Sequence, residues 1–251
     1  MSSGEGTQAR VEELVEELDR LKSGLEARDQ FLALVSHELR SPVHALLLHL
    51  EATLLLGERQ QNATEWMRGR TEKAVHRVRE LSDLLDRFLD VNRIQAGRLD
   101  LDRQEVDLVT LTRESIRRMG NELAWAGCAV SLTAPAELRG HWDPTRLEAV
   151  LANLVGNARK YGAGKPIAVR LEDSGVAAHI FVEDQGPGIA LEHQQRIFER
   201  FERIVGPGRP KIAGLGIGLW ITRHFVEAHG GAIAVSNRPE GGAQFVVTLP
   251  R

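Results

Sequence analysis

Residues 31–42 read FLALVSHELRSP and lie within a segment whose apolar residues are spaced as in a coiled coil. The apolar positions alternate at steps of three and four residues, interrupted only at Arg28, and are Val11, Leu14, Leu18, Leu21, Leu25, Leu32, Val35 and Leu39. This spacing predicts one long helix with a single apolar seam. With Val35 at heptad position d, His37 falls at position f, which points away from the seam, and its neighbour Glu38 supplies a carboxylate.

Pro42 closely follows this histidine and has no amide hydrogen to donate to the carbonyl of Glu38. We therefore expect the helix to bend just after His37. A solvent-facing imidazole beside a carboxylate on a bent helix is a candidate phosphoryl acceptor. Taken alone, a histidine at position f is ordinary polar surface, and the case for chemistry depends on the rest of the chain.

The composition is that of a soluble globular protein. The chain has 251 residues, a length that suits two modest domains. Of these residues, 42% are hydrophobic and 27% are charged. A formal net charge of −3 does not favour nucleic acid as a partner. Cys128 is the only cysteine, which excludes an internal disulfide and fits a reducing compartment. We find no apolar run of about 18 residues and no signal-peptide core, so the sequence predicts a cytoplasmic chain without a membrane segment.

The first half of the chain has the pattern of a helical hairpin. One helix is expected from Val11 to Leu56, after a disordered stretch over residues 1–10. A turn at Gly57–Gln61 precedes the capping-box sequence Asn62–Glu65, which opens a second helix that ends near Ala96 before Gly97. Two such helices cannot cover both of their apolar faces, so a dimeric four-helix bundle completes the hairpin.

After a boundary near residues 97–104, short β-branched runs alternate with helical patterns. Strands are expected at residues 128–133, 167–171, 177–183, 232–236 and 244–249, and helices at residues 108–126, 143–161 and 216–229. Asp143 is a predicted N-cap, and Gly162 and Gly230 stand where helices end on glycine. The second half is therefore predicted to be an α+β two-layer sandwich.

The helix at residues 143–161 carries polar side chains suited to a metal-bound phosphate. Asn153 and Asn157 are four residues apart and share a face, and Lys160 follows one turn later. An amide oxygen is a hard neutral ligand for Mg²⁺, and an ammonium group suits phosphate oxygens. Solvated asparagines on a surface helix are the simpler alternative for this motif alone.

Two glycine motifs follow. The strand at residues 177–183 leads into Asp184-Gln-Gly186-Pro-Gly188, where a carboxylate can accept from the amine of adenine and glycines leave room for a flat ring. Gly214-Leu215-Gly216-Ile-Gly218 opens a helix, whose amides and dipole favour phosphates. Neither a P-loop nor a Rossmann fingerprint fits this spacing. The basic, glycine- and proline-containing segment at residues 203–213 is expected to be a mobile loop that closes over a triphosphate.

A zinc site is excluded. His37-Glu38 is followed by Ser41 where a second zinc-binding histidine would stand, and the single cysteine offers no cluster.

Together these motifs resemble the sensor histidine kinases of two-component signalling over residues 31–249. Residues 31–42 resemble the H box, 153–161 the N box, 184–188 the G1 box, 197–201 the F box and 214–219 the G2 box. The resemblance implies a coiled-coil signalling helix (residues 11–30), a dimerisation and phosphotransfer domain (31–97) and a catalytic ATP-binding domain of the Bergerat fold (104–251).

The resemblance also implies the role of each residue. His37 would be the phosphoacceptor and Glu38 the base beside it. Asn157 would hold Mg²⁺, supported by Asn153. The remaining residues would bind ATP: Lys160 and Tyr161 at phosphate or ribose, Asp184, Gly186 and Gly188 at adenine, Phe198 and Phe201 as anchors of the lid, and Gly214, Leu215, Gly216 and Gly218 at the phosphates. The implied partners are a second copy of the chain and the receiver domain of a response regulator, which takes the phosphoryl group on an aspartate.

Ser41 departs from the family pattern, in which threonine or asparagine is common at this position and is linked to dephosphorylation of the partner. Two other functions remain open on the motifs alone. One is an ATP-driven conformational machine with the same nucleotide fold, such as a chaperone or a DNA-repair ATPase. The other is a catalytically silent scaffold whose helical bundle only binds partners.

Overall fold

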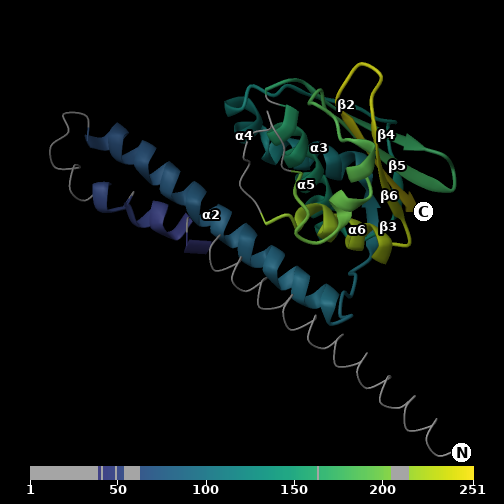
Figure 1. The fold of residues 1–251 in the computed structure, drawn as a ribbon, viewed down its shortest axis with the longest axis horizontal. Helices are drawn as coiled ribbons and strands as arrows, with labels where there is room; N and C mark the ends of the chain where they lie inside the picture. Colours follow the sequence, from purple (N-terminus) through teal and green to yellow (C-terminus); the bar gives the residue numbers. More distant parts are fainter. Residues whose placement is uncertain (1–38, 41, 49, 54–62, 163, 205–214) are drawn as a thin grey trace, which may run out of the picture. The chain divides into compact units, whose positions relative to one another are not determined.

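A computed structural model describes residues 39–40, 42–48, 50–53, 63–162, 164–204 and 215–251 (Figure 1). The chain divides into two compact units, residues 1–88 and 89–251. The predicted coiled coil before residue 39, the turn at residues 57–61 and the cap at Asn62 lie outside the described residues.

The described residues of the first unit are helical, as predicted. The described residues between Leu39 and Thr53 are helical, and α2 runs over Ala63–Gln95. Arg70 of α2 donates from Nε to the hydroxyl of Thr53 at 2.8 Å, which links the two helical segments. Among the described residues, none of the helices combines the length and the apolarity needed to cross a membrane.

Helix α2 ends at the predicted glycine. Gly97 has φ 63°, its N–H donates to the carbonyl of Ile94, and the N–H of Arg98 donates to the carbonyl of Arg93. These two bonds form a Schellman motif, which satisfies carbonyls that the last turn would leave unpaired. The last turns of α2, from Leu89 onward, belong to the second unit.

The second unit contains a five-stranded sheet with strand order β2-β4-β5-β7-β6. The strands are β2 (Val130–Thr133), β4 (Ile167–Asp173), β5 (Ala177–Glu183), β6 (Ala232–Asn237) and β7 (Ala243–Pro250). β2 pairs with β4 in parallel, and the other neighbours are antiparallel. All five strands lie where the alternating runs predicted them.

Helices cover one face of this sheet, as Figure 1 shows. They are α3 (Leu108–Arg118), α4 (Gly120–Trp125), α5 (Pro144–Gly162) and α6 (Gly218–Ala228), with short 3-10 turns at η1 (Leu191–His193) and η2 (Arg196–Phe198). Along β5 and β7 every second residue is buried, because only one face of the sheet packs on the helices. The predicted two-layer α+β sandwich is confirmed.

Two details of the second unit differ from the prediction. The helix expected at residues 108–126 is divided between α3 and α4, because Met119 caps the first helix and the second starts at Gly120. Gly162 is the last residue of α5 and not the residue after the helix. Gly230 does end α6 in the left-handed region, at φ 80°.

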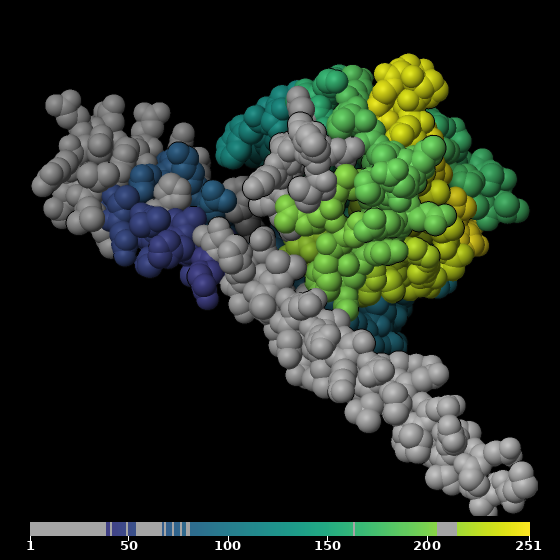
Figure 2. Space-filling model, viewed as in Figure 1, coloured from purple at the N-terminus to yellow at the C-terminus, as the bar shows by residue number. Residues whose placement is uncertain are grey.

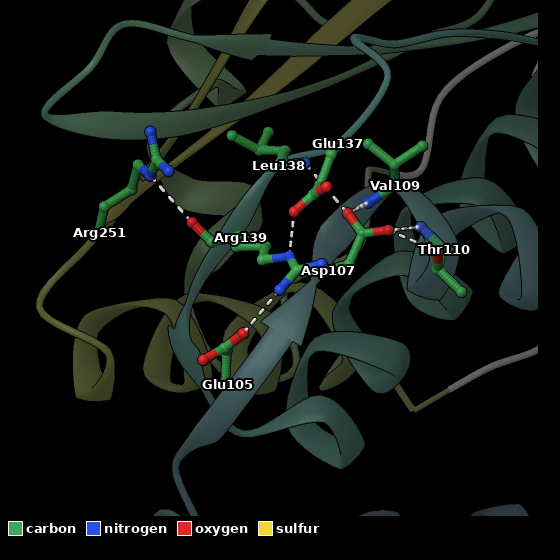
Figure 3. Close-up of polar contacts among 8 residues, drawn as sticks. All are labelled: Glu105, Asp107, Val109, Thr110, Glu137, Leu138, Arg139 and Arg251. Atoms are coloured by element: carbon green, nitrogen blue, oxygen red, sulfur yellow. Dashed lines mark hydrogen bonds and ion pairs between the residues drawn. The ribbon is translucent and has the colours of Figure 1, made fainter.

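A second, two-stranded sheet was not predicted. β1 (Gln104–Asp107) pairs in antiparallel fashion with β3 (Arg139–Trp142). Arg251, at the end of the chain, donates from Nε to the carbonyl of Arg139 at 2.9 Å, as Figure 3 shows. The indole Nε1 of Trp142 donates to the carbonyl of Pro250 at 2.8 Å, so the small sheet is tied to β7.

Asp107 joins the small sheet to α3 (Figure 3). Its carboxylate accepts from the N–H groups of Val109 and Thr110, each at 3.2 Å, and from the N–H of Leu138 at 3.0 Å. Burial raises the pKa of Asp107, but these bonds and the Thr110 hydroxyl together outweigh burial, so the pKa lies below its usual value. Asp107 is thus an ionised N-cap of α3.

His229 is a buried contact between α6 and the start of α5. Only 1% of its surface is exposed. Its Nδ1 lies 2.7 Å from the carbonyl of Phe225, and its Nε2 accepts from the N–H of Asp143 at 3.0 Å. Because a carbonyl can only accept and an amide N–H can only donate, the ring is neutral with its proton on Nδ1.

This arrangement predicts acid sensitivity. Burial lowers the pKa of His229, as does the nearby Arg103, and these effects exceed the opposing ones of Phe225 and Asp143. The neutral ring contributes its full stabilisation above the unfolded pKa of about 6.5, and this stabilisation is lost as the pH falls through the lower folded pKa. The loss amounts to about 1.4 kcal/mol for each unit by which the two pKa values differ. Urea unfolding from pH 8 to 5 should show this loss.

The matched control is the exposed histidine His141. The substitution His229→Gln should lower stability at pH 8 and flatten its dependence on pH, whereas His141→Gln should leave the dependence unchanged. An equally steep loss of stability on acidification in His229→Gln would show that another group is responsible.

Candidate functional site

A pocket opens between α5, α6 and the end of the sheet. Several of the predicted nucleotide-binding residues line it together. The lining residues are Asn157, Tyr161, Asp184, Pro187, Gly188, Ile189, Ile197, Glu202, Arg203, Ile204, Leu219, Ala243 and Phe245. Residues from the N box, the G1 box, the start of the F box and the end of the G2 box therefore meet in one cavity, although they are separated by tens of residues in the sequence.

Asp184 is fixed at the end of β5 and is 6% exposed. Its Oδ1 accepts from the N–H of Gly186 at 2.8 Å and from the N–H of Ala243 at 3.1 Å. The described residues provide no hydrogen-bond partner for Oδ2. One carboxylate oxygen is thus held by the backbone, and the other is available to accept from a ligand amine.

Helix α5 presents the residues of the N box in different environments. Asn157 and Tyr161 line the pocket, and the described residues give the Asn157 amide no hydrogen-bond partner. Lys160 is exposed and does not line the pocket. Asn153 also lies outside the lining and donates from Nδ2 to the hydroxyl of Thr222 on α6 at 2.8 Å.

The glycines of the site are required by close contacts within the protein. A Cβ on Gly186 would lie 2.7 Å from the carbonyl oxygen of Tyr161, and one on Gly218 would lie 2.3 Å from Oδ1 of Asn153. Gly188 and Gly216 have φ 70° and 68°, a conformation that favours glycine. We expected these glycines to make room for the ligand, and the structure shows that four of them also allow the loops and helices to pack together.

The F box contributes Ile197 to the pocket wall, and its two phenylalanines are not lining residues. Phe198 is buried and packs edge-on against Phe245, a pocket residue, with 6.4 Å between ring centroids. Phe201 has φ 66°, and its N–H donates to the carbonyl of Gly216 at 3.0 Å. The F box and the G2 box are therefore joined by a backbone hydrogen bond, with Leu215 buried next to it.

Other predicted site residues lie outside the described residues. They are His37, Glu38, Ser41 and Gly214, together with most of the expected mobile loop.

The structure also identifies pocket residues that the motifs did not. Ala243 and Phe245 come from the start of β7, and Glu202 follows the F box. Glu202 pairs with Arg196 at 2.8 Å. The Gly241-Gly242 pair before β7 was the available signal: a Cβ on Gly242 would lie 2.0 Å from the carbonyl oxygen of Asp184, so only glycine permits this approach.

The donor chemistry of the pocket fits a magnesium ion bound mainly by a nucleotide. The described residues contain no cluster of three histidine, cysteine or acidic side chains that would form an all-protein site. Mg²⁺ commonly takes one or two protein oxygens and fills its other positions with phosphate oxygens and water. The amide oxygen of Asn157 is suited to this role.

Comparison with known families gives two matches, which are separated by residues 98–141. Residues 27–97 match the His Kinase A (phospho-acceptor) domain. Residues 142–251 match the family of histidine kinase-, DNA gyrase B- and HSP90-like ATPases.

Two curated relatives resemble most of the chain. The sensor-like histidine kinase SenX3 of Mycobacterium tuberculosis is 35% identical over 225 residues, which are 89% of this chain and 54% of the relative. The signal transduction histidine-protein kinase AfsQ2 of Streptomyces coelicolor is 34% identical over 94% of this chain and 45% of the relative. The chain thus spans about half the length of these relatives.

Solved structures extend the similarity to the fold. Full-length ShkA in complex with AMPPNP matches 88% of this chain and 45% of that chain, with a TM-score of 0.61 and 27% identity. The mycobacterial sensor histidine kinase MprB matches 59% of this chain and 97% of that chain, with a TM-score of 0.52 and 27% identity.

Proposed function

Because the chain belongs to the sensor histidine kinases of two-component signalling, we propose that it phosphorylates itself on His37 from ATP and passes the phosphoryl group to a response regulator. The observation that carries this proposal is the pocket in which Asn157, Asp184 and Gly188 meet. A pocket with these residues suits a nucleotide. His37, the proposed acceptor of the phosphoryl group, lies within residues 27–97, which match the phospho-acceptor domain.

In this reaction a neutral ring nitrogen of His37 attacks the γ-phosphorus in line. The bond to the β–γ bridging oxygen breaks, ADP leaves, and Glu38 accepts or orients the proton of the ring. Asp184 holds the adenine, and the backbone at the start of α6 faces the phosphates. Most of the rate enhancement comes from positioning the histidine and the triphosphate.

We propose that Asn157 holds Mg²⁺ on the phosphates, where the ion would neutralise negative charge. Asn153 would support this role indirectly, since its bond to Thr222 holds α5 and α6 together. Tyr161 would contact the ribose or phosphates at the pocket edge, and Lys160 would contact phosphate from the exposed side of α5. Phe198, Phe201 and the G2 residues would support the loop over the triphosphate.

The test of this function is the chemistry of the label. Incubation with γ-labelled ATP should label the protein through a bond that is labile in acid and stable in alkali, as expected for a phosphohistidine. Labelled protein should then transfer its phosphoryl group to one or a few receiver domains from the same genome.

The same assay separates the two alternative functions. A conformational ATPase would hydrolyse ATP without acid-labile labelling. A silent scaffold would show neither labelling nor measurable binding of Mg-ATP.

We also propose that the chain is a homodimer, with the phosphotransfer hairpin as the interface. Four apolar side chains of α2 follow a heptad seam, with Val75 and Leu89 at position a and Val78 and Leu85 at position d. Each is 43–50% exposed in a single chain. A seam of this kind needs a packing partner, and a second copy of the hairpin completes a four-helix bundle.

Charges placed on this seam should dissociate the dimer. We expect the whole chain to sediment as a dimer at micromolar concentration and the double substitution Val78→Glu with Leu85→Glu to give a monomer. Lys73→Glu, at an exposed position of the same helix, is the charge control and should remain dimeric. A monomeric wild-type chain would contradict the proposed bundle.

A further inference from the structure

One residue outside the pocket holds both backbone groups of a pocket residue. The N–H of Ile189 donates to Oδ1 of Asn237 at 2.8 Å, and Nδ2 of Asn237 donates to the carbonyl of Ile189 at 2.8 Å. Ile189 lines the pocket, whereas Asn237, at the end of β6, does not. The side-chain amide therefore pairs with Ile189 as a neighbouring strand would.

Further contacts restrict the same segment. Gln194 donates from Nε2 to the carbonyl of Ile189 at 3.1 Å, so this carbonyl accepts two hydrogen bonds. The preceding residue, Gly188, has φ 70°, and a Cβ there would lie 2.9 Å from Oδ1 of Asn237. The left-handed turn at Gly188 thus brings Ile189 against the asparagine.

The loop that follows Asn237 also contacts Asp184, the residue proposed to bind adenine. Arg238 donates from Nη1 to the carbonyl of Asp184 at 3.3 Å, and the N–H of Ala243 donates to Oδ1 of Asp184. The loop is closed by the N–H of Arg238, which donates to the carbonyl of Gly242 at 3.0 Å. Figure 2 shows the last part of the sequence, which includes this loop, in yellow at the surface of the second unit. The hairpin formed by β6 and β7 therefore fixes both Asp184, at the start of the G1 box, and Ile189, directly after it.

We propose that Asn237 is a positioning residue for the nucleotide: it fixes Ile189 and so presets the wall of the pocket before the ligand arrives. The inference rests on the proposed nucleotide binding. A loop that is already ordered loses less conformational entropy on binding, and this gain appears in affinity. Because both side-chain hydrogen bonds of Asn237 go to Ile189 and not to the residues proposed to hold the phosphates, its loss should raise Kd and KM more than it lowers kcat.

Two substitutions test the two hydrogen bonds. Asn237→Leu preserves the approximate size and removes both bonds, and Asn237→Asp keeps the acceptor for the Ile189 N–H but loses the donor. In the whole chain, we expect each substitution to weaken ADP binding by roughly three- to tenfold, as calorimetry measures it. KM for ATP should rise by a similar factor with kcat within about twofold of wild type, and the Ile189 amide should exchange its hydrogen faster in the nucleotide-free protein. Ser236→Ala, at the preceding exposed position of β6, should leave all of these values unchanged.

The outcomes are distinguishable. Unchanged ADP affinity in both Asn237 variants would overturn the inference, as would a loss of kcat equal to the rise in KM. If Asn237→Leu does not fold, Asn237→Asp decides. A wild-type chain that fails to bind ADP at all would overturn the proposed function and this inference with it, whereas wild-type binding with unaffected variants would overturn the inference alone.

Discussion

The substitution His37→Gln should abolish phosphoryl incorporation from ATP, with labelling reduced to background, while the protein still binds nucleotide. Glutamine preserves polarity and helix propensity but has no nucleophilic ring nitrogen, so the acceptor is lost without disturbance of the seam. The pocket belongs to the second unit, residues 89–251, so its affinity for ATP should stay within about twofold of wild type. Labelling and calorimetry on the same preparation measure the two effects.

His44 provides the matched control. It lies seven residues after His37 in the sequence, beyond Pro42, and is exposed. We expect His44→Gln to be labelled as the wild type is. Acid-labile label that persists in His37→Gln and disappears in His44→Gln would move the phosphoacceptor to His44.

The sequence was sufficient to predict those helices and strands whose residue pattern is local. The alternation of apolar residues along β5 and β7 reflects burial of one sheet face and is visible in any window of a few residues. The stop of α2 at Gly97 was equally readable, because the left-handed residue of a Schellman motif is usually glycine. In such cases the local signal and the tertiary structure agree.

The small sheet of β1 and β3 could not be predicted in the same way. Its strands have four residues each, and β3 reads Arg-Gly-His-Trp, without β-branched residues. Gly140 belongs there because a Cβ would lie 2.3 Å from the ring of Trp142, a contact that only the folded chain reveals. Strand formation here depends on tertiary packing, which outweighs local propensity.

The same distinction between local and tertiary signals applies to the residues of the site. Asp184 and Asn157 were found because their side-chain chemistry and spacing suit a nucleotide. Asn237 was missed because its role consists of two hydrogen bonds to a residue 48 positions away, for which the local sequence carries no signal. Sequence motifs thus identified groups that line the pocket, and the structure was needed to identify those that hold them.

The substitution Asp184→Asn should weaken ATP binding by about ten- to a hundredfold. A hydrogen bond to a charged group is worth roughly 1.5–3 kcal/mol, and the substitution removes such a bond to the adenine amine. The structure sharpens this expectation, because Oδ1 of Asp184 already accepts from Gly186 and Ala243. If the asparagine oxygen keeps those two bonds, its NH₂ group takes the place of Oδ2 and meets the adenine amine donor to donor.

Base selectivity distinguishes loss of recognition from general damage. Guanine carries a carbonyl acceptor where adenine carries its amine, so an asparagine NH₂ at this position repels adenine and no longer repels guanine. We therefore expect the ratio of ATP to GTP affinity to fall in Asp184→Asn, whereas a merely disordered pocket would lose both nucleotides equally. Asp173→Asn is the control, since Asp173 pairs with Arg251 at 2.8 Å, away from the pocket lining, and should retain wild-type affinity and selectivity. An unchanged ATP dissociation constant in Asp184→Asn would show that another group reads the adenine.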